Sequence, residues 1–191
     1  MAQKYGWLLI AAAIVVTADQ LSKFMVLSRL TTAFDGDASA LGTFYGRPPE
    51  PSYDGLRFRP KDRVVFAGGF LTFTYAENDG AAFGLFRNVP RAYRAPLFYA
   101  VTLGALLLVF YYWRQLRGGR DERFARVGLP LLLGGALGNA IDRLTRGFVI
   151  DFLDVHRGDL HWPAFNVADV TLVVGVMFLL VDSFVRREPK K

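Results

Sequence analysis

The chain has 191 residues, of which 52% are hydrophobic and 21% are charged, and its formal net charge is +6. It contains no cysteine and two histidines, His156 and His161, which excludes a disulfide framework, a thiolate nucleophile and a Cys-ligated zinc or iron–sulfur site. A three-histidine metal site is excluded as well, and a Ser-His-Asp triad would have to use one of the two histidines. If the protein is an enzyme, we expect its seventeen acidic residues to carry the chemistry.

The hydrophobic residues form four blocks, which predict membrane-spanning helices at about residues 7–29, 96–113, 127–144 and 167–185. Only the second block, Pro96–Trp113, reaches spanning length without a charge. The others include ionisable residues, each of which costs about 2.5–3.5 kcal/mol at the bilayer centre. The first block also fits a cleaved signal peptide, but its apolar pattern continues past Lys23 and favours a retained helix. The charge-free second block disfavours a soluble helical bundle.

Basic residues in two short segments predict the orientation of these helices. Residues 114–126 and 186–191 together contain nine Lys or Arg and three Asp or Glu. The positive-inside rule places both segments in the cytoplasm, and an even number of spans then places the N-terminus there too. Because membrane topology explains the basic character, and no basic residues interleave with aromatic ones on one face, we expect no nucleic-acid partner.

The segments at about 30–95 and 145–165 are then expected on the outer side. Residues 31–63 are rich in Gly, Pro and Asp and are predicted to be a loop. Val64–Phe66 and Phe70–Tyr75 have the composition of short strands. The predicted fold class is an all-α membrane protein: one domain with a four-transmembrane-helix bundle and a small outer β platform between helices 1 and 2.

Polar side chains from three helices and one short loop are predicted to meet at one depth near the outer face. Asp19 lies 12 residues beyond Trp7, and Asn139 lies 12 residues beyond Val127, which is about 18 Å along a helix in each case. Ionisable residues inside a membrane are functional candidates by default. The predicted set is Asp19, Lys23, Asn139, Asp142, Arg143, Asp151, Asn166 and Asp169.

Structural roles compete with the functional one at these positions. Asp19 and Lys23 have the spacing of an ion pair within a helix. Asn166 and Asp169 have the spacing of a helix N-cap and a first-turn acid. For Asp169 we favour function, because a cap needs no second carboxylate nearby.

Two neighbouring carboxylates in a low-dielectric site share one proton, so they can deprotonate a water molecule while donating to a carbonyl oxygen. This chemistry needs neither Cys, His nor a metal ion. Asp151 and Asp169, 18 residues apart, are the natural pair. Asp154 and Asp142 are competing partners, and spacing alone leaves the choice open.

Five segments of the sequence resemble the bacterial lipoprotein signal peptidase (signal peptidase II) family. They are Asp19–Lys23, Asn78–Gly84, Gly138–Arg143, Gly147–Phe152 and Phe165–Asp169. The resemblance covers nearly the whole chain except about residues 31–63. It implies an aspartic endopeptidase of the inner membrane, with four helices and a periplasmic β platform, whose site lies near the periplasmic face. Such an enzyme cleaves the signal peptide of a diacylglyceryl-modified prolipoprotein just before the lipidated cysteine.

By position, the resemblance assigns the catalytic pair to Asp151 and Asp169. It assigns substrate-binding or supporting roles to Asp19, Lys23, Asn78, Gly80, Asn139, Asp142, Arg143 and Asn166. Arg143 is expected to be held by Asp19 or Asp142, and the asparagines are expected to orient the peptide backbone. No cofactor or metal is expected. The expected partners are the prolipoprotein substrate and membrane lipid, and the expected state is a monomer.

Two features depart from the family pattern. Asp79 stands where the family commonly has threonine, and residues 31–63 form a longer outer stretch, which is interpreted as a lid, a docking surface or an inert loop. The main alternative function is a small non-enzymatic transporter or proton-relay protein. Its pathway should continue to the cytoplasmic side, where the blocks carry no ionisable residue until Asp182. A membrane scaffold, whose polar cluster serves only helix association, is a third possibility.

Overall fold

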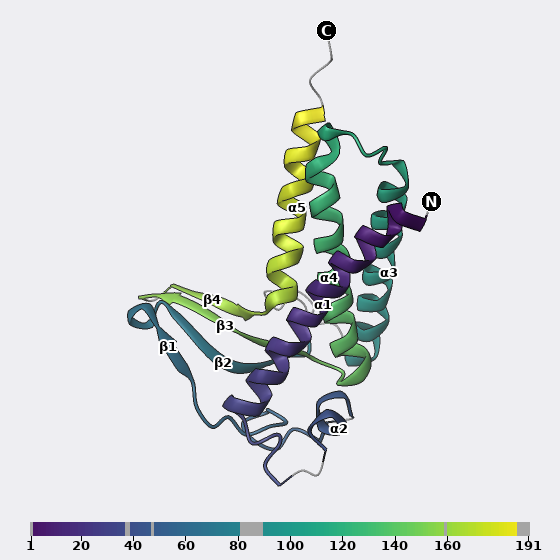
Figure 1. Cartoon of the computed structure of the whole chain (residues 1–191). Coiled ribbons are helices and arrows are strands. Elements are labelled where there is room, and N and C mark those ends of the chain that lie inside the picture. The colour runs from purple at the N-terminus through teal and green to yellow at the C-terminus, as the bar shows by residue number, and fades with distance from the viewer. Residues whose placement is uncertain (1, 37–38, 47, 81–89, 159, 187–191) are drawn as a thin grey trace. The chain divides into compact units, whose positions relative to one another are not determined.

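The computed structural model describes residues 2–36, 39–46, 48–80, 90–158 and 160–186 (Figure 1). Its elements in chain order are α1 (Ala2–Leu30), α2 (Ala40–Tyr45), β1 (Val64–Phe66), η1 (Ala67–Gly69), β2 (Leu71–Asn78), α3 (Arg91–Gln115), η3 (Arg120–Glu122), α4 (Arg123–Thr145), β3 (Val149–Arg157), β4 (Leu160–Phe165) and α5 (Val167–Arg186). The chain divides into two compact units. Unit 1 comprises Met1–Asp19, Leu97–Ala140 and Val167–Lys191, and unit 2 comprises Gln20–Pro96 and Ile141–Asn166. Helices α1 and α4 therefore contribute residues to both units.

Four helices, α1, α3, α4 and α5, are long and apolar enough to cross a membrane, which confirms the predicted number among the described residues. Each helix extends beyond its predicted span. The start of α3 at Arg91 precedes the predicted start at Pro96, because the intervening charged and aromatic residues can continue a helix although they lower its hydrophobicity. The chain is thus a multi-pass membrane protein.

The core of unit 1 joins the first half of α1 to α3 and α4. Leu8, Trp113 and Leu129 are buried in one hydrophobic cluster. By contrast, Leu107 and Leu108 on α3 are 61% and 68% exposed, and large exposed apolar side chains on a spanning helix suit contact with lipid.

Small residues allow close helix packing in unit 1, as the Gly134-x-x-x-Gly138 pattern suggests. A Cβ atom at Gly134 would lie 2.5 Å from Val15 Cβ, and one at Gly138 would lie 2.6 Å from Asp19 Oδ2. Neither position has room for a side chain, so the backbone of α4 packs directly against α1 here.

Unit 2 contains a four-stranded antiparallel sheet in the order β1-β2-β3-β4 (Figure 1). The two predicted strands are present, but the prediction of a platform built only between helices 1 and 2 is incomplete. Strands β3 and β4 come from the segment between α4 and α5. Their pattern is hidden in the sequence because the first four residues of β3 are all buried, and strand alternation is lost where both faces are covered.

The predicted loop at residues 31–63 contains a short helix and a core of its own. Ser39 caps α2 by accepting a hydrogen bond from the Gly42 amide. Phe44 of α2 is 1% exposed, and its ring lies 5.3 Å from that of Phe24 on α1. A helix of six residues is too short to show a periodic pattern, which is why the sequence predicts only a loop.

Candidate active site

The carboxylate of Asp151 on β3 is held by two side-chain amides. Asn78 Nδ2 donates to Asp151 Oδ2 over 2.8 Å, and Asn166 Nδ2 donates to Asp151 Oδ1 over 2.7 Å. Asp151 is 2% exposed and Asn166 is fully buried. The Gly80 amide donates to Asn78 Oδ1 over 3.0 Å, so the side chain of Asn78 is itself oriented. Neutral amide donors fix the position of this carboxylate without adding a charge.

Asp142 is the centre of a second buried network in unit 2. Its Oδ2 accepts from Lys23 Nζ over 2.8 Å and from the Ile150 amide over 3.3 Å. Its Oδ1 accepts from Gln20 Nε2 and from Arg146. Asp142 and Lys23 are both fully buried, and a buried charge is tolerated only when it is paired and hydrogen-bonded in this way. Because Ile150 directly precedes Asp151, Asp142 also helps to hold the start of β3.

Sequence reasoning missed Arg146 in this network. Arg146 forms an ion pair with Asp142 and lies four residues after it. Its Nη1 donates to the Phe44 carbonyl over 2.6 Å, and its guanidinium lies 4.2 Å from the centre of the Phe44 ring. The i, i+4 spacing from Asp142 is the signal that could have found it. The predicted site residue Arg143, also on α4, is half-buried.

In unit 1, the carboxylate of Asp169 accepts a hydrogen bond from a side-chain amide. Asn139 Nδ2 on α4 donates to Asp169 Oδ1 over 2.8 Å. Asp169 lies in the first turn of α5, where the helix dipole favours a negative charge. Asp19 of α1 accepts a hydrogen bond from the Ala168 amide over 3.0 Å, and Asp19 thereby satisfies one of the free N–H groups of the same helix end.

An ionic cluster lies at the end of β2, next to Asn78. Arg57 donates through both its backbone amide and its Nη1 to Glu77, and its Nη1 is 3.3 Å from Asp79 Oδ1. Burial lowers the pKa of Arg57, but the hydrogen bond to Glu77 and the charges of Asp79 and Glu77 outweigh it and raise the pKa overall. Arg57 therefore stays charged and balances the negative charge that Asp79 adds.

Tyr75 belongs to the same cluster. Its hydroxyl donates to Glu77 Oε1 over 2.7 Å, and its side chain is 4% exposed. Burial and the neighbouring charge of Glu77 raise the pKa of Tyr75, so the phenol remains a neutral hydrogen-bond donor.

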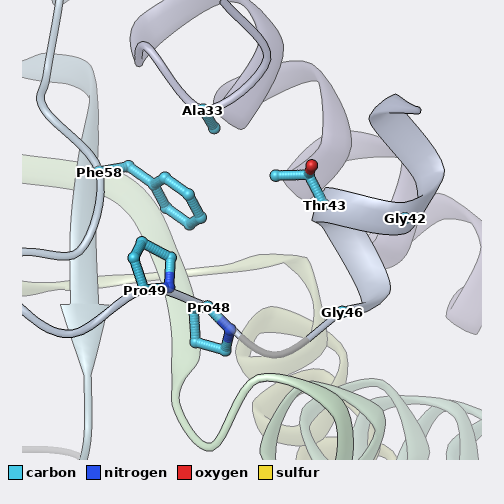
Figure 2. Close-up of a pocket in the computed structure, with 7 residues that line it drawn as sticks. All are labelled: Ala33, Gly42, Thr43, Gly46, Pro48, Pro49 and Phe58. Carbon is cyan, nitrogen blue, oxygen red and sulfur yellow. The ribbon is translucent and has the colours of Figure 1, made fainter. Parts of the chain in front are cut away.

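A cavity of about 670 Å³ lies within the 31–63 segment (Figure 2). Its lining consists of Ala33, Gly42, Thr43, Gly46, Pro48, Pro49 and Phe58. Among the described residues, no carboxylate lines this cavity, so the carboxylates of the candidate site lie elsewhere.

The predicted residues are thus brought together in two groups. In unit 2, Lys23 pairs with Asp142, and Asn78, Gly80 and Asn166 belong to the hydrogen-bond network of Asp151. In unit 1, Asp19, Asn139 and Asp169 lie at the start of α5. In the described part of the chain, no group of three His, Asp or Glu side chains has the arrangement of a metal site. Buried carboxylates held by amides, on a scaffold of apolar spanning helices, are typical of a membrane-embedded enzyme that uses carboxyl groups for acid–base catalysis.

Comparison with known proteins identifies the family. Residues 11–185 match the family model of signal peptidase II. The lipoprotein signal peptidase of Anaeromyxobacter sp. (strain Fw109-5) is 39% identical over 181 residues, which cover 92% of this chain and 84% of that protein. The lipoprotein signal peptidase of Syntrophus aciditrophicus (strain SB) is 36% identical over 182 residues, or 95% and 94% of the two chains. The chain therefore belongs to the signal peptidase II family of membrane proteases, as the five segments predicted.

A solved structure has a similar fold. The structure of a bacterial membrane enzyme matches with a TM-score of 0.67 and 25% sequence identity, over 97% of this chain and 94% of that one. The fold is thus shared over almost the full length of both proteins.

Proposed function

We propose that this membrane protease cleaves the signal peptide of diacylglyceryl-modified prolipoproteins just before the lipidated cysteine, with Asp151 and Asp169 as its catalytic pair. Family membership and the relatives named lipoprotein signal peptidase support the reaction. One observation supports the choice of pair: Asp151 and Asp169 are both held by asparagine side-chain amides. A hydrogen bond from a neutral amide positions a carboxylate without itself adding a charge, so it leaves the carboxylate chemically suited to acid–base catalysis.

The competing carboxylates are less suited to this role. Asp142 is bound to two cations, Lys23 and Arg146, and is needed to compensate their buried charges. Asp154 pairs across the sheet with Thr72, and its Oδ2 lies 3.9 Å from His156 Nδ1. Asp142 is buried and also accepts from the Gln20 side-chain amide, so it is its two ion pairs that indicate a structural role.

The proposed reaction is water attack with shared acid–base catalysis. The ionised carboxylate takes a proton from water while the water oxygen bonds to the scissile carbonyl carbon. The protonated partner donates its proton to the carbonyl oxygen, which gives a neutral tetrahedral diol. The first carboxyl then protonates the leaving nitrogen as the C–N bond breaks, and the partner recovers a proton from the diol hydroxyl. We assign Asp19, Lys23, Asn78, Gly80, Asn139, Asp142, Arg143 and Asn166 to binding and support.

We place the site toward the periplasmic side of the inner membrane, with both termini in the cytoplasm. Five arginines lie between the last turn of α3 and the first turn of α4 and favour a cytoplasmic location for this connection: Arg114, Arg117, Arg120, Arg123 and Arg126. Asp169 lies in the first turn of α5 and Arg186 in its last turn, about 25 Å apart along the axis. Since the basic end of α5 is expected inside, Asp169 is expected near the outer face.

Replacing the two carboxylates tests the proposal. Asp151→Asn and Asp169→Asn should each lower cleavage of a diacylglyceryl-modified prolipoprotein by at least about 1,000-fold, because neither amide can transfer the proton. Asp154→Asn, on the same strand, is the matched control and should retain activity. Retained activity in a correctly inserted Asp151 or Asp169 variant would exclude the pair, and equal cleavage of an unlipidated precursor would exclude the proposed substrate.

A further inference from the structure

The 31–63 segment is joined to the supports of Asp151 at two places, each built around one arginine. The first is Arg146, whose Nη1 donates to the Phe44 carbonyl on α2 and whose guanidinium stacks on the Phe44 ring. The same guanidinium is paired with Asp142, and Asp142 accepts from the amide of Ile150, the residue before Asp151. A chain of direct contacts therefore links α2 to the amide of Ile150, directly before the proposed catalytic residue.

The second place is Arg57, which lies within the segment itself. Arg57 donates to Glu77 through its backbone amide and its side chain. Glu77 precedes Asn78, the residue that donates to Asp151 Oδ2. The Arg57 guanidinium also lies 4.5 Å from the centre of the Phe148 ring, and Phe148 is three residues before Asp151 in the chain. Arg57 thus contacts β2 and the residue directly before β3, and these two strands pair at Asp151.

The burial of the side chains that make these contacts argues against a mobile lid. Phe44, Phe58 and Arg146 are 1%, 7% and 4% exposed. Opening the segment would bring two aromatic side chains into water and would take the Phe44 carbonyl and ring away from the buried Arg146 guanidinium, both of which are unfavourable. The described residues that make these contacts are therefore packed into unit 2.

We infer that the 31–63 segment positions Asp151 for catalysis, with Arg146 and Arg57 as the positioning residues. This inference rests on the proposed role of Asp151. This positioning role differs from the three that the sequence left open. A lid or a docking surface would change substrate binding, and an inert loop would change neither binding nor the chemical step. A positioning role acts on the chemical step, and it acts equally on every substrate.

Kinetics on the full-length protein in detergent distinguish these roles. Arg146→Gln and Arg57→Gln should each lower kcat by about 10- to 100-fold, since small displacements of a catalytic group have effects of that size. KM should stay within about twofold, because substrate contacts are unchanged. Two diacylglyceryl-modified prolipoproteins with different signal sequences should show the same fold loss. Arg146→Lys should recover part of kcat, since it keeps the charge next to Asp142 but not the planar contact with Phe44.

Arg59→Gln is the matched control. Arg59 is an exposed arginine of the same segment, and its guanidinium lies over the Tyr53 ring at 5.4 Å. This variant should have the parent kcat and KM. All rates are normalised to the folded fraction, measured by the thermal unfolding transition, so that a loss of folding is not read as a loss of catalysis.

The outcomes separate this inference from the proposed function. If Asp151→Asn is inactive while Arg146→Gln and Arg57→Gln have the parent kcat per folded molecule, the positioning role is wrong and the catalytic pair stands. A rise in KM at constant kcat, or a fold loss that differs between the two substrates, would also overturn it in favour of a docking surface or lid. If Asp151→Asn retains activity, the proposed mechanism fails first, and the positioning inference fails with it.

Discussion

Asn166 donates its side-chain amide to Asp151 over 2.7 Å, and the next residue begins α5, the helix that carries Asp169 in its first turn. An asparagine in this position commonly caps the helix that follows. Here its side-chain amide donates to the carboxylate of Asp151, and Asp19 of α1 accepts a hydrogen bond from the Ala168 amide of the same helix end. Asn166 therefore stands at the position of a helix cap and also holds the proposed catalytic residue Asp151.

Removing this amide should impair catalysis. We expect Asn166→Ala to lower kcat by about 10- to 100-fold, because a hydrogen bond to a charged group contributes about 1.5–3 kcal/mol. Asn166→Asp should be more severe at neutral pH, since it places a second negative charge against Asp151. Steady-state kinetics of the three proteins check both statements. An Asn166→Asp variant as active as the parent would show that this contact has no part in the reaction.

Close packing at Gly138 should not tolerate a methyl group. The Cβ atom of Gly138→Ala would lie 2.6 Å from Asp19 Oδ2 and 3.3 Å from Ala168 Cβ, so Asp19 must shift from the start of α5. Overpacking of this kind costs about 1–3 kcal/mol. We expect a lower thermal midpoint in detergent. Gly104→Ala on α3, where a Cβ meets nothing within 4 Å, is the control and should leave the midpoint equal or higher.

The buried pair of Lys23 and Asp142 should show strong coupling. Lys23→Met leaves Asp142 buried with one cation fewer, and breaking a buried pair costs about 3–5 kcal/mol. Asp142→Asn alone should also destabilise, but the double variant should lose less than the sum of the two, because neither charge is then left alone. Chemical unfolding of the parent and the three variants measures the coupling. Strictly additive losses would contradict a direct interaction.

Asp182 should matter for stability and not for catalysis. Its Oδ1 accepts from the Ala125 amide over 3.0 Å, its Oδ2 accepts from the Tyr112 hydroxyl over 2.9 Å, and Oδ2 lies 2.8 Å from Arg186 Nε in an ion pair. We expect Asp182→Ala to destabilise the protein by about 1–3 kcal/mol through these lost and unsatisfied hydrogen bonds, with kcat per folded molecule unchanged. A fall in kcat at constant folded fraction would instead favour a proton pathway that reaches the far end of α5.

The buried phenol of Tyr75 should make stability depend on alkaline pH. Burial and the charge of Glu77 raise its pKa in the folded state, whereas the unfolded phenol ionises at about pH 10. Above about pH 10 the unfolded state therefore binds fewer protons than the folded state, and stability falls as pH rises. The parent should lose thermal midpoint faster than Tyr75→Phe between about pH 9.5 and 11. Parallel midpoint curves would show that Tyr75 titrates normally.

Much of the fold is readable from the sequence because the bilayer imposes a simple rule. A membrane span must be long, apolar and helical, so blocks such as Pro96–Trp113 can be predicted from the sequence alone. No comparable rule predicts strands β3 and β4 from the sequence. The first residues of β3 are buried on both faces, and whether they form a strand depends on β2, which lies some 70 residues earlier in the chain.

The candidate site divides in the same way. The sequence by itself determined which residues are chemically suited to the reaction, because ionisable side chains in apolar helices are costly and stand out against that background. Only the tertiary structure decided the partners of each side chain: Asn78 and Asn166 for Asp151, Lys23 and Arg146 for Asp142, and Asp19 for the start of α5. These contacts join residues up to 149 positions apart. Local spacing carries no information about such pairs, since they form only when buried donors and acceptors must find each other during folding.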